Sequence, residues 1–213
     1  GTYQFDPTKN NGVADVLSSA DAWSISQTLI LADLQAYAVS NDLLNWTRNR
    51  QSVIWDVGYN TDIKNALIDV FNARKDQILI LQASVWGQTT TVAQRYSLMQ
   101  TLATKVRLLP ESALYGTPAC RCSISVWDGN IIDEATGGTF PLTLDLAYQF
   151  AKIGGNASGY MSATNSPDHG DNRILTKMYN PTITFESDDA AANNFDEGGI
   201  TIRPYDDSQY YRP

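Results

Sequence analysis

A hydrolase that attacks through serine or cysteine needs a base beside its nucleophile. His169 is the one histidine of the chain, so it alone could act as an imidazole base, with Asp56 after an apolar run as a carboxylate to orient it. The third member of a triad is missing. Ser187 and Ser208 lie in polar, acidic stretches, and the chain contains no G-x-S-x-G motif. We therefore predict that His169 is a surface-loop residue and that the chain has no catalytic residues.

Carboxylates offer two other kinds of chemistry, glycoside hydrolysis and calcium binding. Three of the chain's adjacent acidic pairs are Asp188-Asp189, Asp196-Glu197 and Asp206-Asp207. All of them lie in the acidic C-terminal stretch, where like charges are usually solvated. Asp168, Asp171 and Asn172 could hold calcium, but their spacing lacks the pattern of an EF-hand loop. Solvation and loop capping are the favoured interpretations.

Two further patterns could serve a metal or a phosphate. Cys120 and Cys122 flank Arg121 in a predicted strand, but no second ligand pair accompanies them, so we expect two free, half-buried thiols in a reducing compartment. Residues 154–159 are glycine-rich, yet they follow a predicted helix, whereas a phosphate loop follows a strand and opens a helix. The sequence predicts no metal and no cofactor.

Apolar periodicity predicts the elements that would carry any such site. The expected strands are residues 53–57, 78–81 and 123–127, and the expected helices are 22–37, 63–71, 92–106 and 141–153. Asn60 or Thr61 can cap the second helix, and Asp128-Gly129 should close the third strand. Strands that alternate with helices at these spacings indicate an α/β fold: a mixed, largely parallel sheet flanked by helices.

Two expectations concern which side chains face the core. Ile25, Leu29, Ala32 and Ala36 share one face of the first helix, which is its predicted apolar face. Trp55, Trp86 and Trp127 stand in or just after strands and are predicted core residues, whereas Trp23 and Trp46 lie near helix ends and could face a partner.

The chain divides into three regions. Residues 1–20 read as an extended N-terminal segment and 21–155 as the α/β core domain. Residues 156–213 are loop-rich, with short strands at 182–185 and 200–202, and they either pack on the core or lead to a missing domain. The last 27 residues carry six acids and two arginines. We expect 200–202 to dock as an edge strand.

Charge narrows the classes of partner. The chain has 213 residues, a net charge of −8 and 19 aspartates against 4 glutamates. A negative net charge argues against a nucleic-acid binder, which needs clustered Lys and Arg. No apolar run approaches the roughly 18–20 residues of a membrane span, and the N-terminus carries no pattern of a signal peptide.

Short motifs at fixed places in this order carry a resemblance to a known family. They are Asn72-Ala73-Arg74-Lys75-Asp76 before a strand, Val126-Trp127-Asp128-Gly129 at a strand end, Thr139-Phe140-Pro141-Leu142 opening a helix, and Gly159-Tyr160-Met161-Ser162-Ala163. The order of features in residues 53–165 resembles that of the contractile tail sheath proteins of bacteriophages. The general character of the sequence is most similar to the sheath proteins of giant phiKZ-like phages. The chain is much shorter than a whole sheath subunit, and its start at Gly1 suggests a trimmed, protease-resistant-type fragment.

The resemblance implies a late, structural virion protein and no enzyme activity. Such a subunit assembles helically around the tail tube and contracts to drive genome ejection into the host. The implied partners are further copies of itself, the tail tube protein and baseplate proteins, and the implied location is the virion tail, assembled in the bacterial host cytoplasm. A fragment without the exchange segments should be monomeric. The alternative is a hydrolase or carbohydrate-binding domain whose site is built from dispersed Asp residues.

Overall fold

The computed structural model of the chain describes residues 19–42, 44–45, 47–48, 53–86, 88, 90–131, 139–147, 178–179, 199–200, 203–204 and 211–212. The first half alternates helices and strands: α1 (Ser19–Tyr37), β1 (Val53–Trp55), α2 (Thr61–Ala73), β2 (Ile78–Gln82), α3 (Val92–Arg107), the 3-10 helix η1 (Pro118–Arg121) and β3 (Cys122–Ser125). The strands that follow are β4 (Asp128–Ile131), β5 (Thr139–Pro141), β6 (Met178–Tyr179), β7 (Gly199–Ile200), β8 (Arg203–Pro204) and β9 (Tyr211–Arg212). Residues 142–147 are also helical. The predicted α/β fold is confirmed.

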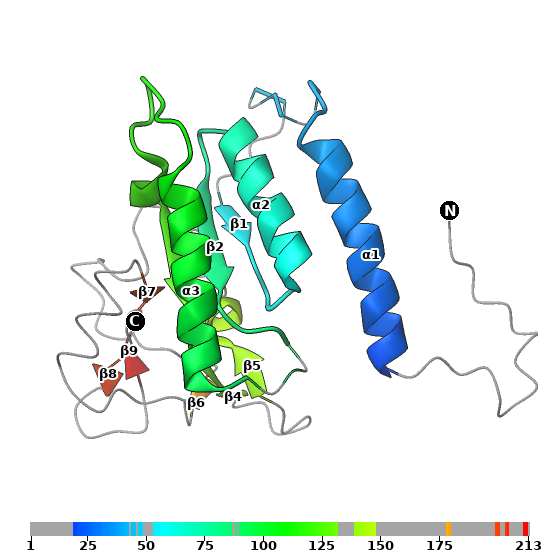
Figure 1. Ribbon diagram of the computed structural model, residues 1–213, viewed down its shortest axis with the longest axis vertical. Helices are drawn as coiled ribbons and strands as arrows, with labels where there is room; N and C mark the ends of the chain where they lie inside the picture. The colour runs from blue at the N-terminus through cyan, green and yellow to red at the C-terminus, as the bar shows by residue number, and fades with distance from the viewer. Residues whose placement is uncertain are drawn as a thin grey trace, which may run out of the picture.

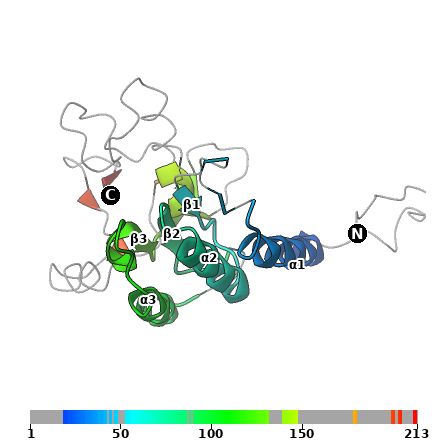
Figure 2. The ribbon, with the colours of Figure 1, turned by 90° about the horizontal axis from the view of Figure 1, so that it is seen from above.

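The main sheet has four strands in the order β1-β2-β3-β7, all of them parallel. Ile54 pairs with Leu79, and Leu81 pairs with Ile124, so β2 is an inner strand with a neighbour on each side. Helices α2 and α3 cover one face of the sheet, and α1 lies beyond α2 (Figures 1 and 2). A smaller antiparallel sheet has the order β5-β4-β6, and β8 pairs with β9.

Local sequence signals explain where the two central helices begin. The Asn60 side chain accepts a hydrogen bond from the Ile63 N–H at 3.0 Å and caps α2. Thr91 and Gln94 form a capping box at the start of α3, in which each side chain bonds the other residue's backbone N–H. Lys105 and Arg107 stand in the last turn of α3, where positive charge favours the helix dipole.

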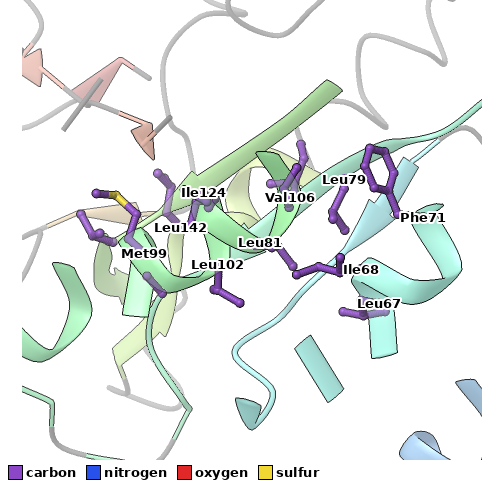
Figure 3. Close-up of a cluster of buried hydrophobic side chains, with 14 of the residues drawn as sticks. Leu67, Ile68, Phe71, Leu79, Leu81, Met99, Leu102, Val106, Ile124 and Leu142 are labelled. Carbon is purple, nitrogen blue, oxygen red and sulfur yellow. The ribbon is translucent and has the colours of Figure 1, made fainter. Parts of the chain in front are cut away.

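The core lies between the sheet and the helices α2 and α3. Phe71 and Ile68 of α2, Leu81 of β2 and Leu102 of α3 are all buried, with at most 1% of each exposed (Figure 3). All four residues lie within the helices and strands that the apolar pattern predicts. Among the described helices, none combines the length and apolar character that crossing a membrane requires.

The face of α1 that packs against the rest of the protein differs from the face that its sequence predicts. Leu29 is 40% exposed, and both Ala32 and Ala36 are exposed, so the predicted apolar face lies largely in solvent. Gln27 is buried instead, and Leu34 packs half-buried against the core. The prediction failed because polar and apolar residues are mixed on every side of α1, so its periodicity does not mark a single face.

Four further expectations are corrected. Strand β1 ends at Trp55, two residues before the predicted end at residue 57, and it is half-buried at the sheet edge. Asp128 and Gly129 begin strand β4, because they pair with Pro141 and Phe140 of β5. Pro141 therefore ends a strand, and the helix starts after it.

The third correction concerns a thiol: Cys120 belongs to η1 and is exposed, while Cys122 opens β3 and is half-buried. The fourth is Trp86, which is 41% exposed rather than core.

Candidate functional site

The polar side chains that the fold brings together lie at the carboxyl ends of the parallel strands. In an open α/β sheet this edge is where ligands usually bind. We define the carboxyl-edge network as Asp56, Lys64, Gln82, Ser84, Arg95 and Asp128, all of which are buried. Asp56 follows β1, Gln82 ends β2, and Asp128 follows β3. Two carboxylates and two cations are therefore enclosed at one end of the sheet.

Asp56 is held from four sides. Its Oδ1 accepts hydrogen bonds from the backbone N–H groups of Gly58 and Tyr59 at 2.9 and 3.0 Å. Its Oδ2 accepts one from the backbone N–H of Gln82 at 2.9 Å and one from Lys64 Nζ at 2.6 Å. The carboxylate thus joins the end of β1 to β2 and α2. All four of its bonds come from within the protein, which is the arrangement that a buried carboxylate requires.

Lys64 reaches the network from the first part of α2. Both its side chain and that of Asp56 are 0% exposed. Burial lowers the pKa of Lys64, because the ammonium loses its hydration, and the neighbouring Asp56 carboxylate partly offsets this. An isolated lysine with a lowered pKa could act as a base, but this one is bonded to Asp56 and has no exposed surface.

Gln82 and Ser84 connect the first ion pair to the second. Gln82 Nε2 donates to Ser84 Oγ, to the carbonyl of Trp127 and to Asp128 Oδ1, at 2.9, 2.9 and 2.8 Å. Ser84 Oγ donates to the same Asp128 oxygen at 2.9 Å. Gln82 Oε1, in contrast, is buried and accepts no hydrogen bond within the described part of the chain.

Asp128 forms the second ion pair, with Arg95 of α3. Arg95 Nη1 lies 2.8 Å from Asp128 Oδ2 and also donates to the carbonyl of Val126 at 3.1 Å. Arg95 Nε donates to Thr90 Oγ1 at 2.9 Å, which fixes the guanidinium at the start of the helix. Burial raises the pKa of Asp128, and the charges of Arg95 and Lys64 and the bond from Ser84 oppose that rise.

An aromatic cluster lies beside the network at the same edge of the sheet. We define it as Trp23, Tyr59, Trp86 and Phe140. Trp23 stacks on Tyr59 with ring centroids 5.9 Å apart, and Trp86 meets Trp23 edge-on at 5.3 Å and Phe140 at 5.6 Å. Burial, and secondarily Asp56, raises the pKa of the Tyr59 hydroxyl. The cluster joins α1 to the loops after β1 and β2 and to β5.

The backbone after β1 has a conformation suited to this close packing. Gly58 has φ of +91°, and its carbonyl accepts a hydrogen bond from the Trp86 N–H at 2.7 Å. A Cβ at this position would lie 3.1 Å from the Trp86 nitrogen and from Pro141 Cγ. Glycine therefore permits both the left-handed backbone and the approach of the two loops.

The network binds protein groups to one another. Asp56 and Asp128 each face a cation at bonding distance. Among the described residues, no three His, Cys, Asp or Glu side chains gather as metal ligands would. The geometry suits a structural role, in which ion pairs fix β1 to α2 and β3 to α3.

The structure separates the sequence-predicted candidates into two groups. Asp56 lies in the network, and Cys120 and Cys122 are free thiols. Burial raises the pKa of Cys122 to about 12, so its thiolate is scarce near neutrality. His169, Ser187 and Ser208 lie outside the described residues, as do Trp46, the predicted strand at 182–185, the glycine-rich segment 154–159, the Asp168, Asp171 and Asn172 group, and the three acidic pairs.

The sequence analysis missed five of the six network residues. Lys64 could have been noticed, because it stands next to Ile63 on the apolar side of a helix, where a charge needs a buried partner. Gln82 and Ser84 directly follow an apolar strand, a position at which parallel sheets collect polar groups. The pairing of Arg95 with Asp128 spans distant segments and leaves no local signal.

No protein-family model and no curated protein sequence matches the chain.

Proposed function

We propose that the chain is part of the subunit of a contractile bacteriophage tail sheath, a structural protein that assembles helically around a tail tube. The order of features in residues 53–129 carries this proposal. Strand β1, helix α2, strand β2, helix α3 and strand β3 follow one another and end at Trp127, Asp128 and Gly129. This is the order on which the resemblance of the sequence to sheath proteins rests.

The carboxyl-edge network supports a mechanical role for the same region. A sheath subunit must move as a rigid body when the sheath contracts, since contraction rearranges whole subunits. Buried pairs such as Asp56 with Lys64 and Asp128 with Arg95 resist the sliding of helices against strands, because breaking one leaves a buried charge unpaired. Contraction in this mechanism releases assembly energy and uses no nucleotide.

The alternative, a hydrolase or carbohydrate-binding domain with dispersed aspartates, draws on one observation. Trp86 is 41% exposed within an aromatic cluster, and exposed aromatic rings can stack on sugars. Asp56 of the carboxyl-edge network is fully buried and bonded to Lys64, so it cannot touch a sugar placed on that ring. We therefore favour the sheath assignment.

Electron microscopy of the full-length parent protein tests the proposal. We expect regular hollow tubes, because the proposed subunit assembles helically. The 213-residue chain is the matched control, and in sedimentation at micromolar concentration it should be a monomer. A parent protein that forms only compact particles, or that binds oligosaccharides in the same preparation, would contradict the proposal.

A further inference from the structure

Lys64 carries a primary amine that is enclosed together with a carboxyl group. The side chains of Lys64 and Asp56 are both 0% exposed, and Lys64 Nζ lies 2.6 Å from Asp56 Oδ2. A reagent in solution cannot reach this amine, whereas the carboxyl group of Asp56 is already in bonding contact with it. The side chain on which the amine of Lys64 can act is therefore that of Asp56.

Burial weakens the charged form of this pair. In water, an ammonium and a carboxylate stay charged and hydrated, and in that state they do not condense. Inside the protein the ammonium has lost its hydration, which lowers the pKa of Lys64, while the charges of Asp56 and Asp128 oppose the change. Transfer of the shared proton from Nζ to Oδ2 removes both charges at once, which an interior of low dielectric constant favours.

The two oxygens of the Asp56 carboxyl group are held in different ways. Oδ1 accepts the backbone N–H groups of Gly58 and Tyr59 at 2.9 and 3.0 Å. Fixed backbone donors of this kind stabilise the negative charge that develops on a carbonyl oxygen when its carbon is attacked. Oδ2 faces the amine of Lys64 and also accepts the N–H of Gln82 at 2.9 Å. One oxygen is thus placed to carry the developing charge, and the other is placed to take protons and leave.

We propose that Lys64 and Asp56 condense within the folded chain to form an isopeptide bond, which joins α2 covalently to the end of β1. A proton first moves from Nζ to Oδ2, and the lone pair of the neutral amine then attacks Cγ. A second proton passes from Nζ to Oδ2, the Cγ–Oδ2 bond breaks, and one water leaves. Two hydrogens of the ammonium depart in that water, the third stays on the amide nitrogen, and Oδ1 becomes the amide carbonyl. The linkage forms whether or not the chain builds a sheath.

The fold supplies what this condensation lacks in solution. Well-oriented reactants held together behave as if their concentration were about 10⁵–10⁸ M. The pair has no exposed surface, so water is kept from the amide that forms, and condensation removes two buried charges. The ion pair of the structure is the state that precedes condensation, and the linked form accumulates from it while the chain stays folded.

Tryptic mapping of the folded 213-residue chain after incubation at neutral pH tests the linkage. Trypsin does not cleave after an acylated lysine, so the linked chain should give a peptide of residues 51–74 that is lighter by one water. Its fragmentation should yield no ions from cleavage between residues 56 and 64, because the isopeptide bond closes a ring there. Lys105 and Asp69 are the internal control: they are exposed and 3.8 Å apart, so their linkage should be about tenfold rarer or less.

Two variants supply the second readout. Lys64→Arg keeps the positive charge but removes the amine, so the lighter peptide should disappear. Asp62→Asn removes an exposed carboxyl group from the same tryptic peptide and should leave the linkage unchanged. The wild-type map decides the matter even if Lys64→Arg does not fold. Complete cleavage after Lys64 without loss of water would overturn the proposal, and so would a dehydrated peptide that still fragments between residues 56 and 64.

Discussion

Lys64 and Asp56 place a full charge of each sign in the interior, 2.6 Å apart and 0% exposed. Such a pair adds little net stability compared with apolar residues of the same shape, but losing one partner is expensive because the other charge stays buried. The pair therefore acts less as a source of stability than as a constraint on how α2 meets the sheet. Any movement that separates the two side chains leaves both of them unpaired.

Replacing Lys64 by methionine measures this constraint. Lys64→Met should lower the free energy of unfolding by about 3–5 kcal/mol, because the Asp56 carboxylate loses its cation while remaining buried. Lys105→Met is the matched control: Lys105 is 37% exposed and lies 3.8 Å from an exposed Asp69, so its loss should cost less than about 1 kcal/mol. Urea unfolding of both variants gives the comparison. Equal losses would mean that the buried pair carries no special role.

Asp128 makes the stability depend on pH. Its pKa is raised in the folded protein, so the folded state holds a proton on this carboxyl more tightly than the unfolded state does. The contribution of Asp128 is therefore complete below the ordinary aspartate pKa of 3.8 and is lost as pH rises through the raised value. Asp128→Asn removes this titration but leaves Arg95 charged at every pH.

Unfolding of wild type and Asp128→Asn over a pH series isolates the effect. We expect the stability of wild type relative to the variant to fall as pH increases from about 3 to about 7. Other carboxyl groups titrate in both proteins and cancel in the difference. A difference that rises with pH would mean that the Arg95 cation outweighs burial at this site, so that the pKa of Asp128 is lowered instead.

At the scale of elements, the sequence predicts what local periodicity can encode. Helices α2 and α3 and strands β2 and β3 follow from runs of apolar residues and from the Asn60 cap, because burial on one face leaves a repeating pattern. The buried face of α1 could not be predicted in this way, because polar and apolar residues are mixed on every side of that helix. The ion pair of Arg95 with Asp128 also escaped prediction, since it depends on how β3 approaches α3 and on no neighbouring residue.

The junction between the loops after β1 and β2 depends on one glycine. Gly58→Ala should cost about 2–5 kcal/mol, combining the strain of a positive φ with crowding against the backbone nitrogen of Trp86. Gly116→Ala shares the positive φ, at +69°, but its Cβ would meet open space, so about 1–2 kcal/mol is expected.

Tryptophan fluorescence and near-ultraviolet circular dichroism follow the same two variants. Gly58→Ala should also alter both spectra, because it displaces Trp86 and with it the aromatic cluster. Gly116→Ala should leave both spectra unchanged. Spectra that respond equally to the two substitutions would show that Gly58 does not position the aromatic cluster.

At the scale of the whole molecule, the net charge makes separate copies repel. Two copies of charge −8 repel across a centre separation of roughly 40 Å for a chain of this length. The Debye length at 0.01 M salt is about 30 Å, so much of this repulsion persists where salt is scarce.

Salt weakens this repulsion. The Debye length falls from about 30 Å at 0.01 M to about 8 Å at 0.15 M, which screens charges separated by the distance between whole molecules. The sedimentation coefficient of the 213-residue chain should therefore decrease with increasing protein concentration at about 0.01 M salt and depend far less on concentration at about 0.15 M. Equal concentration dependence at the two salt levels would mean that net charge does not keep the copies apart.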